Sequence, residues 1–230
     1  MKTYTLPHST RSVSSVVLGL MRIPEMSDAE IDTLYRSARD AGIDVFDHAD
    51  IYGGERHLCE KRFGEAVTLS PAERDAIFIQ SKVGIRKGYF DFSKEHILAT
   101  VDGSLAALKT DYLDLLLLHR PDTLVEPQEV AEAFEQLVAA GKVRHFGVSN
   151  HTPGQVELLK SAVKQPLVAN QVQLAAIRKA QPTELSKSIL VEAGQNKGYA
   201  VLRTMVPQPS FVEEATRFLS EAKCEQTPWS

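Results

Sequence analysis

Short apolar runs alternate with segments of helical spacing along most of the chain, and this alternation constrains the fold more than any other feature. The runs occupy residues 16–20, 44–49, 76–82, 112–119, 143–150 and 166–174. Amphipathic segments with capping residues lie between them, at residues 27–42, 93–109 and 126–142. Several runs are almost continuously apolar, which is typical of parallel strands covered on their outer face by helices. The sequence therefore predicts an α/β fold built from repeated β-α units.

Two architectures accommodate such repeats, an open doubly wound sheet and a closed barrel. The open sheet usually carries GxGxxG after its first strand, whereas VVLGLMRIPEM has a single glycine there. We therefore favour a (β/α)8-type barrel. A seventh strand is predicted over 199–206, with helices over 182–198 and 209–223 on either side. No eighth β-α unit is recognisable, so we expect an incomplete barrel whose first and seventh strands have exposed edges.

Composition supports one domain over residues 1–230, because no linker or charge run divides the chain. The net charge of −4 is mild and mixed in sign, which argues against a nucleic-acid partner. Cys59 and Cys224 resemble neither a disulfide framework nor a CxxC site. The longest apolar run, at 113–119, is too short to span a membrane. We expect a cytoplasmic protein, and a homo-oligomer is compatible with the sequence.

Polar residues follow the apolar runs directly, and in barrels the active site lies at these carboxyl ends of the strands. The candidate site residues are Asp47, Tyr52, Lys82, His119, Ser149, Asn150 and Gln171. A tyrosine with a pKa of about 10 becomes a better acid beside a cation, so Lys82 should lower the pKa of Tyr52 while Asp47 holds Lys82. A neutral His119 could orient a carbonyl, and the hydroxyl and amide side chains suit a carboxamide such as that of nicotinamide.

The motifs FDHADIYGG, IQSKVG, DLLLLHRPD, GKVRHFGVSN and NQVQ resemble the aldo-keto reductase superfamily over residues 1–174, while 175–230 diverges. The resemblance implies a barrel that binds NADPH, in preference to NADH, and reduces a small aldehyde or ketone. It makes Tyr52 the proton donor, Lys82 and Asp47 its tuning pair, and His119 the residue that orients the carbonyl. Ser149, Asn150 and Gln171 would grip the nicotinamide amide.

Each candidate also has a structural interpretation. Asp47 could cap a loop and Tyr52 could pack as a half-buried aromatic residue, while Lys82 and His119 could simply end their strands. Ser149 and Asn150 could be the N-cap region of the next helix. A metal cluster of His48, Asp50, His57 and Cys59 is disfavoured because no further ligands stand at suitable spacing, so no metal is expected.

The divergent segment leaves two other functions open. RTMVPQPS stands at 203–210 where the family carries its cofactor-phosphate residues, with Arg203 as a residual phosphate contact or a solvated side chain. A non-catalytic relative that has lost cofactor binding is therefore the alternative, and an unrelated barrel enzyme with an anionic substrate is a third. Tyr89, Phe90 and Phe92 could wall a substrate pocket or pack on the surface.

Overall fold

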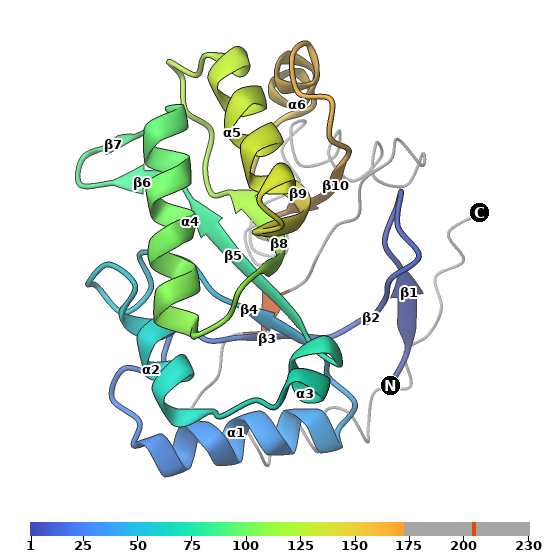
Figure 1. The fold of residues 1–230 in the computed structure, drawn as a ribbon, viewed down its shortest axis with the longest axis vertical. Helices are drawn as coiled ribbons and strands as arrows, with labels where there is room; N and C mark the ends of the chain where they lie inside the picture. The colour runs from blue at the N-terminus through green and yellow to red at the C-terminus, as the bar shows by residue number, and fades with distance from the viewer. Residues whose placement is uncertain (173–203, 206–230) are drawn as a thin grey trace, which may run out of the picture.

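The computed structural model describes residues 1–172 and 204–205 of the 230-residue chain. Seven strands form one curled, wholly parallel sheet with helices on its outer face (Figure 1). From edge to edge the strands are β10 (Leu167–Gln171), β9 (Val143–Ser149), β8 (Leu113–Leu118), β5 (Phe78–Val83), β4 (Val45–Asp47), β3 (Val17–Gly19) and β11 (Thr204–Met205). The predicted barrel-type fold is confirmed, and so are the six predicted strands, although residues 173 and 174 of the sixth lie outside the described residues.

The pairing of β11 corrects one expectation. We expected exposed edges on both the first and the seventh strand, yet β3 pairs with β4 on one side and β11 on the other, with Thr204 opposite Val17. The edges of the described sheet are instead β10 and β11. Of the strand predicted over 199–206, the structure describes Thr204 and Met205, which form β11. The helices predicted over 182–198 and 209–223 lie outside the described residues.

Side chains alternate between two hydrophobic clusters because successive residues of a strand point to opposite faces. Val45, Leu115 and Leu117 belong to the inner cluster, inside the curl of the sheet. Phe46 and Leu116 belong to the outer cluster, between sheet and helices. Both faces of the sheet are therefore buried against apolar side chains, which explains the nearly continuous apolar runs in the sequence.

The outer face is covered by helices that neighbour one another in chain order. They are α1 (Asp28–Asp40), α2 (Leu58–Ala66), α4 (Lys94–Leu108), α5 (Pro127–Ala139) and α6 (Pro153–Lys160). Ser27 begins α1 with a full capping box and Ser93 caps α4, as their positions before acidic residues predicted. A shorter helix, α3 (Pro71–Asp75), precedes β5.

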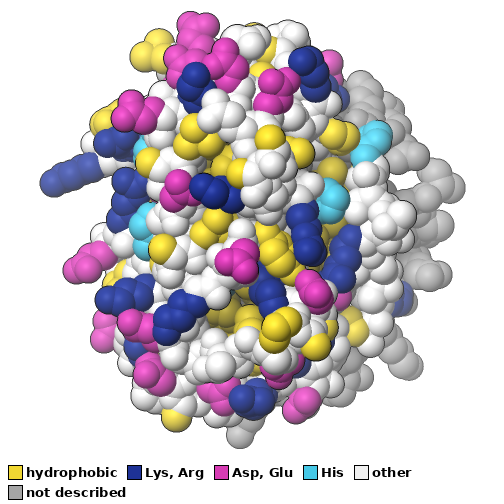
Figure 2. Space-filling model, in the orientation of Figure 1, with side chains coloured by type: hydrophobic (Ala, Val, Ile, Leu, Met, Phe, Trp, Pro, Cys, Tyr) yellow, Lys and Arg dark blue, Asp and Glu magenta, His cyan; other side chains and the backbone are white. Residues whose placement is uncertain are grey.

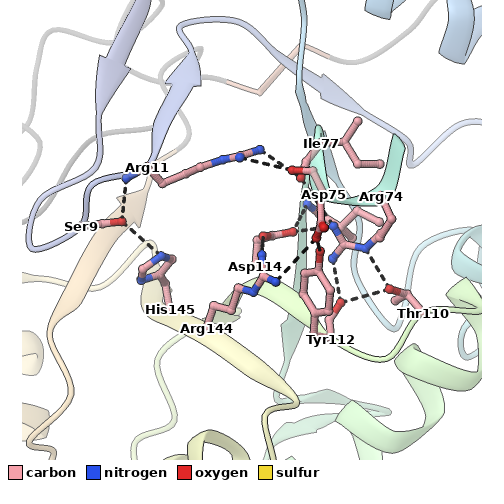
Figure 3. Close-up of polar contacts among 11 residues, drawn as sticks. Ser9, Arg11, Arg74, Asp75, Ile77, Thr110, Tyr112, Asp114, Arg144 and His145 are labelled. Atoms are coloured by element: carbon pink, nitrogen blue, oxygen red, sulfur yellow. Dashed lines mark hydrogen bonds and ion pairs between the residues drawn. The ribbon is translucent and has the colours of Figure 1, made fainter. Parts of the chain in front are cut away.

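Two hairpins that we did not predict complete the described fold, β1 (Thr3–Thr5) with β2 (Ser12–Ser14) and β6 (Ile85–Arg86) with β7 (Tyr89–Phe90). The first lies at the amino ends of the parallel strands. Arg11, in the loop between β1 and β2, donates to the carbonyls of Asp75 and Ile77 at 3.3 and 3.2 Å, just before β5 (Figure 3). The opposite end of the sheet, where the strands finish, carries the candidate site.

An ionic network centred on Asp114 holds the amino ends of β5, β8 and β9 together (Figure 3). Asp114 is buried, pairs with Arg74 at 2.9 Å and Arg144 at 3.4 Å, and accepts from the Ile79 N–H at 3.0 Å. The two guanidinium groups also lie over the Tyr112 ring, 3.9 and 3.6 Å from its centroid. Arg74 is only 8% exposed, so it depends on this carboxylate for its charge balance.

Asp114→Asn should therefore lower the free energy of unfolding by about 3 kcal/mol, because it leaves the buried Arg74 charge uncompensated. Urea denaturation measures the change. The control is Asp102→Asn, which breaks the ion pair between Asp102 and Lys142. Because these side chains are 56% and 38% exposed, the substitution should lower the free energy of unfolding by less than about 1 kcal/mol. Equal losses in the two variants would contradict the structural role given to Asp114.

Candidate active site

The inner face of the sheet changes from apolar to polar at the carboxyl ends of β4 and β5. Asp47 follows Val45 on this face, and Gln80 and Lys82 follow Phe78, because every second residue points inward. The pairing register sets Asp47 opposite Gln80, so Lys82 lies one step further toward the mouth. Strand periodicity and register thus bring a carboxylate and an ammonium group together inside the barrel.

Lys82 is the centre of the site. Its Nζ donates to Asp47 Oδ1 at 2.5 Å, to the His48 carbonyl at 2.8 Å and to Tyr52 Oη at 2.9 Å. An ammonium group has three hydrogens, and these contacts use all of them. Lys82 is 2% exposed and Asp47 fully buried, so the pair is withdrawn from water.

The pKa of Tyr52 differs in direction from the prediction. Burial raises the pKa of the phenol, and the charge and hydrogen bond of Lys82, which lower it, offset this only in part, so the pKa lies above its ordinary value of 10.0. Burial lowers the pKa of Lys82, but Asp47 and Tyr52 outweigh it and the pKa ends above 10.5. At neutral pH the site therefore holds a protonated phenol beside a charged ammonium group.

The loop after β4 carries Tyr52 back over the sheet. Tyr52 N–H donates to the Ala49 carbonyl at 3.1 Å, and its own carbonyl accepts from the Cys59 N–H at 3.3 Å. Gly53 then turns the chain with a φ of +92°, which favours glycine. A side chain there would also meet Pro24 and Cys59. This turn places a loop tyrosine against a strand lysine.

His119 directly follows β8 and faces the phenol. Its ring centroid lies 6.0 Å from that of Tyr52 in an edge-to-face arrangement. Burial, with Lys82 and Arg120 nearby, lowers the pKa of His119 to about 2, so the imidazole is neutral. Nδ1 is buried without a hydrogen-bond partner among the described residues.

Gln171 and Gln80 extend the polar face. Gln171 Nε2 donates to Asp47 Oδ2 at 3.3 Å, and Gln80 Nε2 donates to Asp47 Oδ1 at 2.5 Å. Gln80 was not among the predicted site residues, although its position two residues before Lys82 in a strand indicates the same face. Asp47 thus accepts from three side chains at once.

Ser149, Asn150 and Gln171 form a second group that joins the first through Gln171. Ser149 Oγ donates to the Gln171 carbonyl at 2.9 Å, and Asn150 Nδ2 donates to Ser149 Oγ at 3.0 Å. Asn150 adopts a left-handed backbone with φ of 57°. The N-cap interpretation of Ser149 and Asn150 is wrong, because Thr152 caps α6 in a capping box with Gln155. The pattern T-x-x-Q was visible in the sequence.

The Ser149 hydroxyl and the primary amides of Asn150 and Gln171 lie together at the ends of the adjacent strands β9 and β10. This set of donors and acceptors fits a carboxamide. The family's phosphate-binding residues cannot be matched in the same way, because Arg203 and segment 206–210 lie outside the described residues. Phe92, assigned to a possible pocket wall, is instead buried against His151 and the backbone of Gly84.

The comparisons decide the family. Residues 15–211 match the model of the aldo/keto reductase family. The chain belongs to this family. It is 48% identical over 175 residues to the uncharacterized oxidoreductase YcsN of Bacillus subtilis, covering 71% of this chain and 58% of that protein. It is 36% identical over 178 residues to a 6-dehydroglucose reductase of Agrobacterium fabrum, covering 72% and 59%.

A solved structure agrees with the fold of this aldo/keto reductase family member. The thermostable aldo-keto reductase Tm1743, in complex with the inhibitor epalrestat, matches with a TM-score of 0.74 at 22% identity, covering 98% of this chain and 96% of that one. At this identity the likeness shows the fold alone. The chain spans about six-tenths of the length of the two curated relatives named above.

Two absences hold for residues 1–172 and 204–205, the part of the chain that the structure describes. Within them, no three His, Cys, Asp or Glu side chains gather as metal ligands would. None of the described helices combines the length and apolar character needed to cross a membrane.

A buried acidic pair supports the Tyr52 loop in this family member. Burial opposes ionisation of Glu60, yet hydrogen bonds from His57 Nδ1 at 2.6 Å and Ser81 Oγ at 2.5 Å hold its pKa below the ordinary value. Asp50 is 1% exposed and its Oδ1 has no partner among the described residues. Burial and the nearby Glu60 charge raise the pKa of Asp50 to about 7.

Asp50 should therefore make stability pH-dependent. A raised pKa means that the folded chain binds the Asp50 proton more tightly than the unfolded chain, so the stability that this proton contributes is complete below pH 3.8 and lost as pH rises through about 7. Asp50→Asn removes the ionisation and should raise the free energy of unfolding by about 4 kcal/mol at pH 8 but by only about 2 kcal/mol at pH 5, because each pH unit between 3.8 and about 7 contributes about 1.4 kcal/mol.

Denaturant titrations of both proteins at these two pH values measure the difference. Asp32→Asn, at a partly exposed position on α1, is the matched control and should show no such pH-dependent gain. An equal gain for Asp50→Asn at both pH values would mean that Asp50 is ionised in the folded chain throughout this range.

Proposed function

We propose that this chain reduces an aldehyde or ketone to an alcohol with NADPH, with Tyr52 donating the proton. One observation carries the proposal: Tyr52 Oη lies 2.9 Å from a buried Lys82 ammonium that is itself held by Asp47 at 2.5 Å. Family membership supports the reaction class, and the curated relatives carry names of oxidoreductases.

The three residues divide the work of proton transfer. A phenol is a weak acid, so its loss of a proton to a carbonyl oxygen must be stabilised as it occurs. The Lys82 ammonium already donates to Oη and would strengthen that hydrogen bond as negative charge develops there. Asp47 balances the charge of Lys82 and fixes its direction, so Nζ need not move during the reaction.

His119 and the amide group would position the reactants. The neutral His119 ring lies beside the phenol and can hydrogen-bond a carbonyl oxygen without competing as an acid. The nicotinamide cofactor supplies the hydride when bound. Ser149, Asn150 and Gln171 would hold its carboxamide at the adjoining strand ends, and the family resemblance favours NADPH over NADH.

The two alternatives raised by the sequence were an unrelated barrel enzyme and a non-catalytic relative. An unrelated barrel enzyme is excluded by family membership. A non-catalytic relative without cofactor binding is the alternative, and its decisive residues lie outside the described residues. Turnover of a reactive aldehyde with NADPH at an ordinary enzyme rate would exclude it.

Tyr52→Phe should lower kcat/KM for aldehyde reduction by about 100- to 10,000-fold, because the ring remains and only the proton donor is lost. Steady-state NADPH oxidation with the purified variant measures the effect. Tyr112→Phe, at the amino end of β8, is the control and should retain activity, since its hydroxyl contacts the exposed Asp75. Unchanged reduction by Tyr52→Phe would refute the assigned proton donor.

The pH profile provides an independent check. Reduction needs the protonated phenol, which is the populated form below the pKa of Tyr52, and burial places that pKa above 10.0. We therefore expect kcat/KM to stay level between pH 7 and 9 and to fall only above about pH 10. A decline with a midpoint between pH 7 and 9 that is lost in Lys82→Met would show instead that Lys82 outweighs burial in the working enzyme.

A further inference from the structure

A cavity of about 570 Å³ lies outside the proposed reaction site, between the loop after β4 and the β6–β7 hairpin. Its basic lining residues come from three separate segments: Arg56 from the loop, Arg86 and Lys87 from the hairpin, and His96 from the first turn of α4. Figure 2 shows Lys and Arg side chains with a histidine along the left edge of the molecule, over this hairpin and loop. The cavity therefore has a concentrated positive lining.

The cations retain capacity for a ligand. Lys87 makes no hydrogen bond or ion pair within the part of the chain that the structure describes. Arg86 uses one guanidinium nitrogen to pair with Asp91 at 2.9 Å, and Arg56 uses one to donate to Thr100 Oγ1 at 2.5 Å. A guanidinium group carries five N–H donors, so each arginine keeps several.

His96 lines the cavity, but its ring nitrogens are not exposed to it. It is 6% exposed, and Arg86 Nη1 can only donate to its Nδ1, at 3.4 Å. Burial lowers the pKa of His96, so the ring is neutral and its single hydrogen belongs on Nε2. That Nε2 is buried and has no partner among the described residues.

Carboxyl groups balance part of the positive charge in the cavity. Glu55 and Asp50 line it as well. Burial raises the pKa of Asp50 to about 7, so close to neutrality this carboxyl is only partly ionised. Arg86 is already paired with Asp91, whereas Arg56 and Lys87 form no ion pair with a carboxylate among the described residues. These two cations give the lining a small excess of positive charge, which favours an anion as ligand.

We propose that this cavity binds the phosphate group of a small molecule, with Arg56, Arg86 and Lys87 as its donors. Guanidinium forks and an ammonium group suit the several acceptor oxygens of phosphate. Asp50 and Ile51 line the cavity and immediately precede Tyr52, so a phosphate bound there lies beside the loop of the proton donor. The phosphate could belong to the carbonyl substrate, which rests on the proposed function, or be free in solution.

Calorimetric titration of the full chain with inorganic phosphate tests the site without any turnover. Lys87→Gln should raise Kd at least about tenfold, equivalent to about 1.4 kcal/mol, and Arg56→Gln/Lys87→Gln should abolish binding. Lys61→Gln makes the same charge change on the exposed side of α2 and should leave Kd unchanged. No binding by the unaltered chain, or equal Kd values for Lys87→Gln and Lys61→Gln, would overturn the proposal.

A matched pair of substrates identifies the source of the phosphate. If it is part of the substrate, kcat/KM for glyceraldehyde 3-phosphate relative to glyceraldehyde should fall at least about tenfold in Lys87→Gln but not in Lys61→Gln. An unchanged ratio together with lost phosphate binding supports the site and assigns it to a free phosphate. Reduction of neither aldehyde would count against the proposed function, while the calorimetric result for the site would stand.

Discussion

The buried ion pair of Lys82 and Asp47 is the interaction on which the rest of the site depends. An ammonium group that is 2% exposed is stable only if its charge and all its hydrogens are matched, and Asp47, the His48 carbonyl and Tyr52 Oη supply the match. The alignment of β4 with β5 makes this possible. A one-residue slip in that register would turn Lys82 or Asp47 toward the helices and leave the other charge unpaired.

The ion pair also links stability to chemistry. The same three contacts that satisfy Lys82 aim its charge at the oxygen of Tyr52, so the site is prepared for negative charge before any substrate arrives. Burial works in the opposite direction and keeps the phenol protonated. A donor that remains protonated at rest and is stabilised as it ionises suits a proton-transfer step near neutral pH.

Much of this arrangement could be predicted from the sequence, because strand periodicity and barrel topology leave little choice. The apolar runs identified the strands, and their polar ends identified Asp47, Lys82 and His119 as neighbours at one mouth. Gln80 could have been found by the same period of two. The hairpin of β1 and β2 at residues 3–14 was missed because its strands are three residues each, too short to show alternation.

The remaining differences arise where local pattern does not decide the outcome. The direction of the Tyr52 pKa depends on how burial compares with one nearby charge, which a sequence does not reveal. Ser149 and Asn150 could resemble an N-cap by residue type, but the left-handed backbone of Asn150 delays the helix until Thr152. The basic cavity joins segments about 30 to 40 residues apart, and neither Arg56 nor His96 stands out locally.

The most direct test of the proposed carbonyl reduction follows the hydrogen that is transferred from NADPH to the substrate. NADPH carrying deuterium at both C4 positions would be incubated with the purified chain and a reactive aldehyde, and the alcohol would be analysed by mass spectrometry. Our account predicts one deuterium on the former carbonyl carbon, with the oxygen-bound hydrogen taken from the protein and solvent. A folded protein that yields no labelled alcohol would contradict it and favour a relative that has kept the strand-end residues without the reaction.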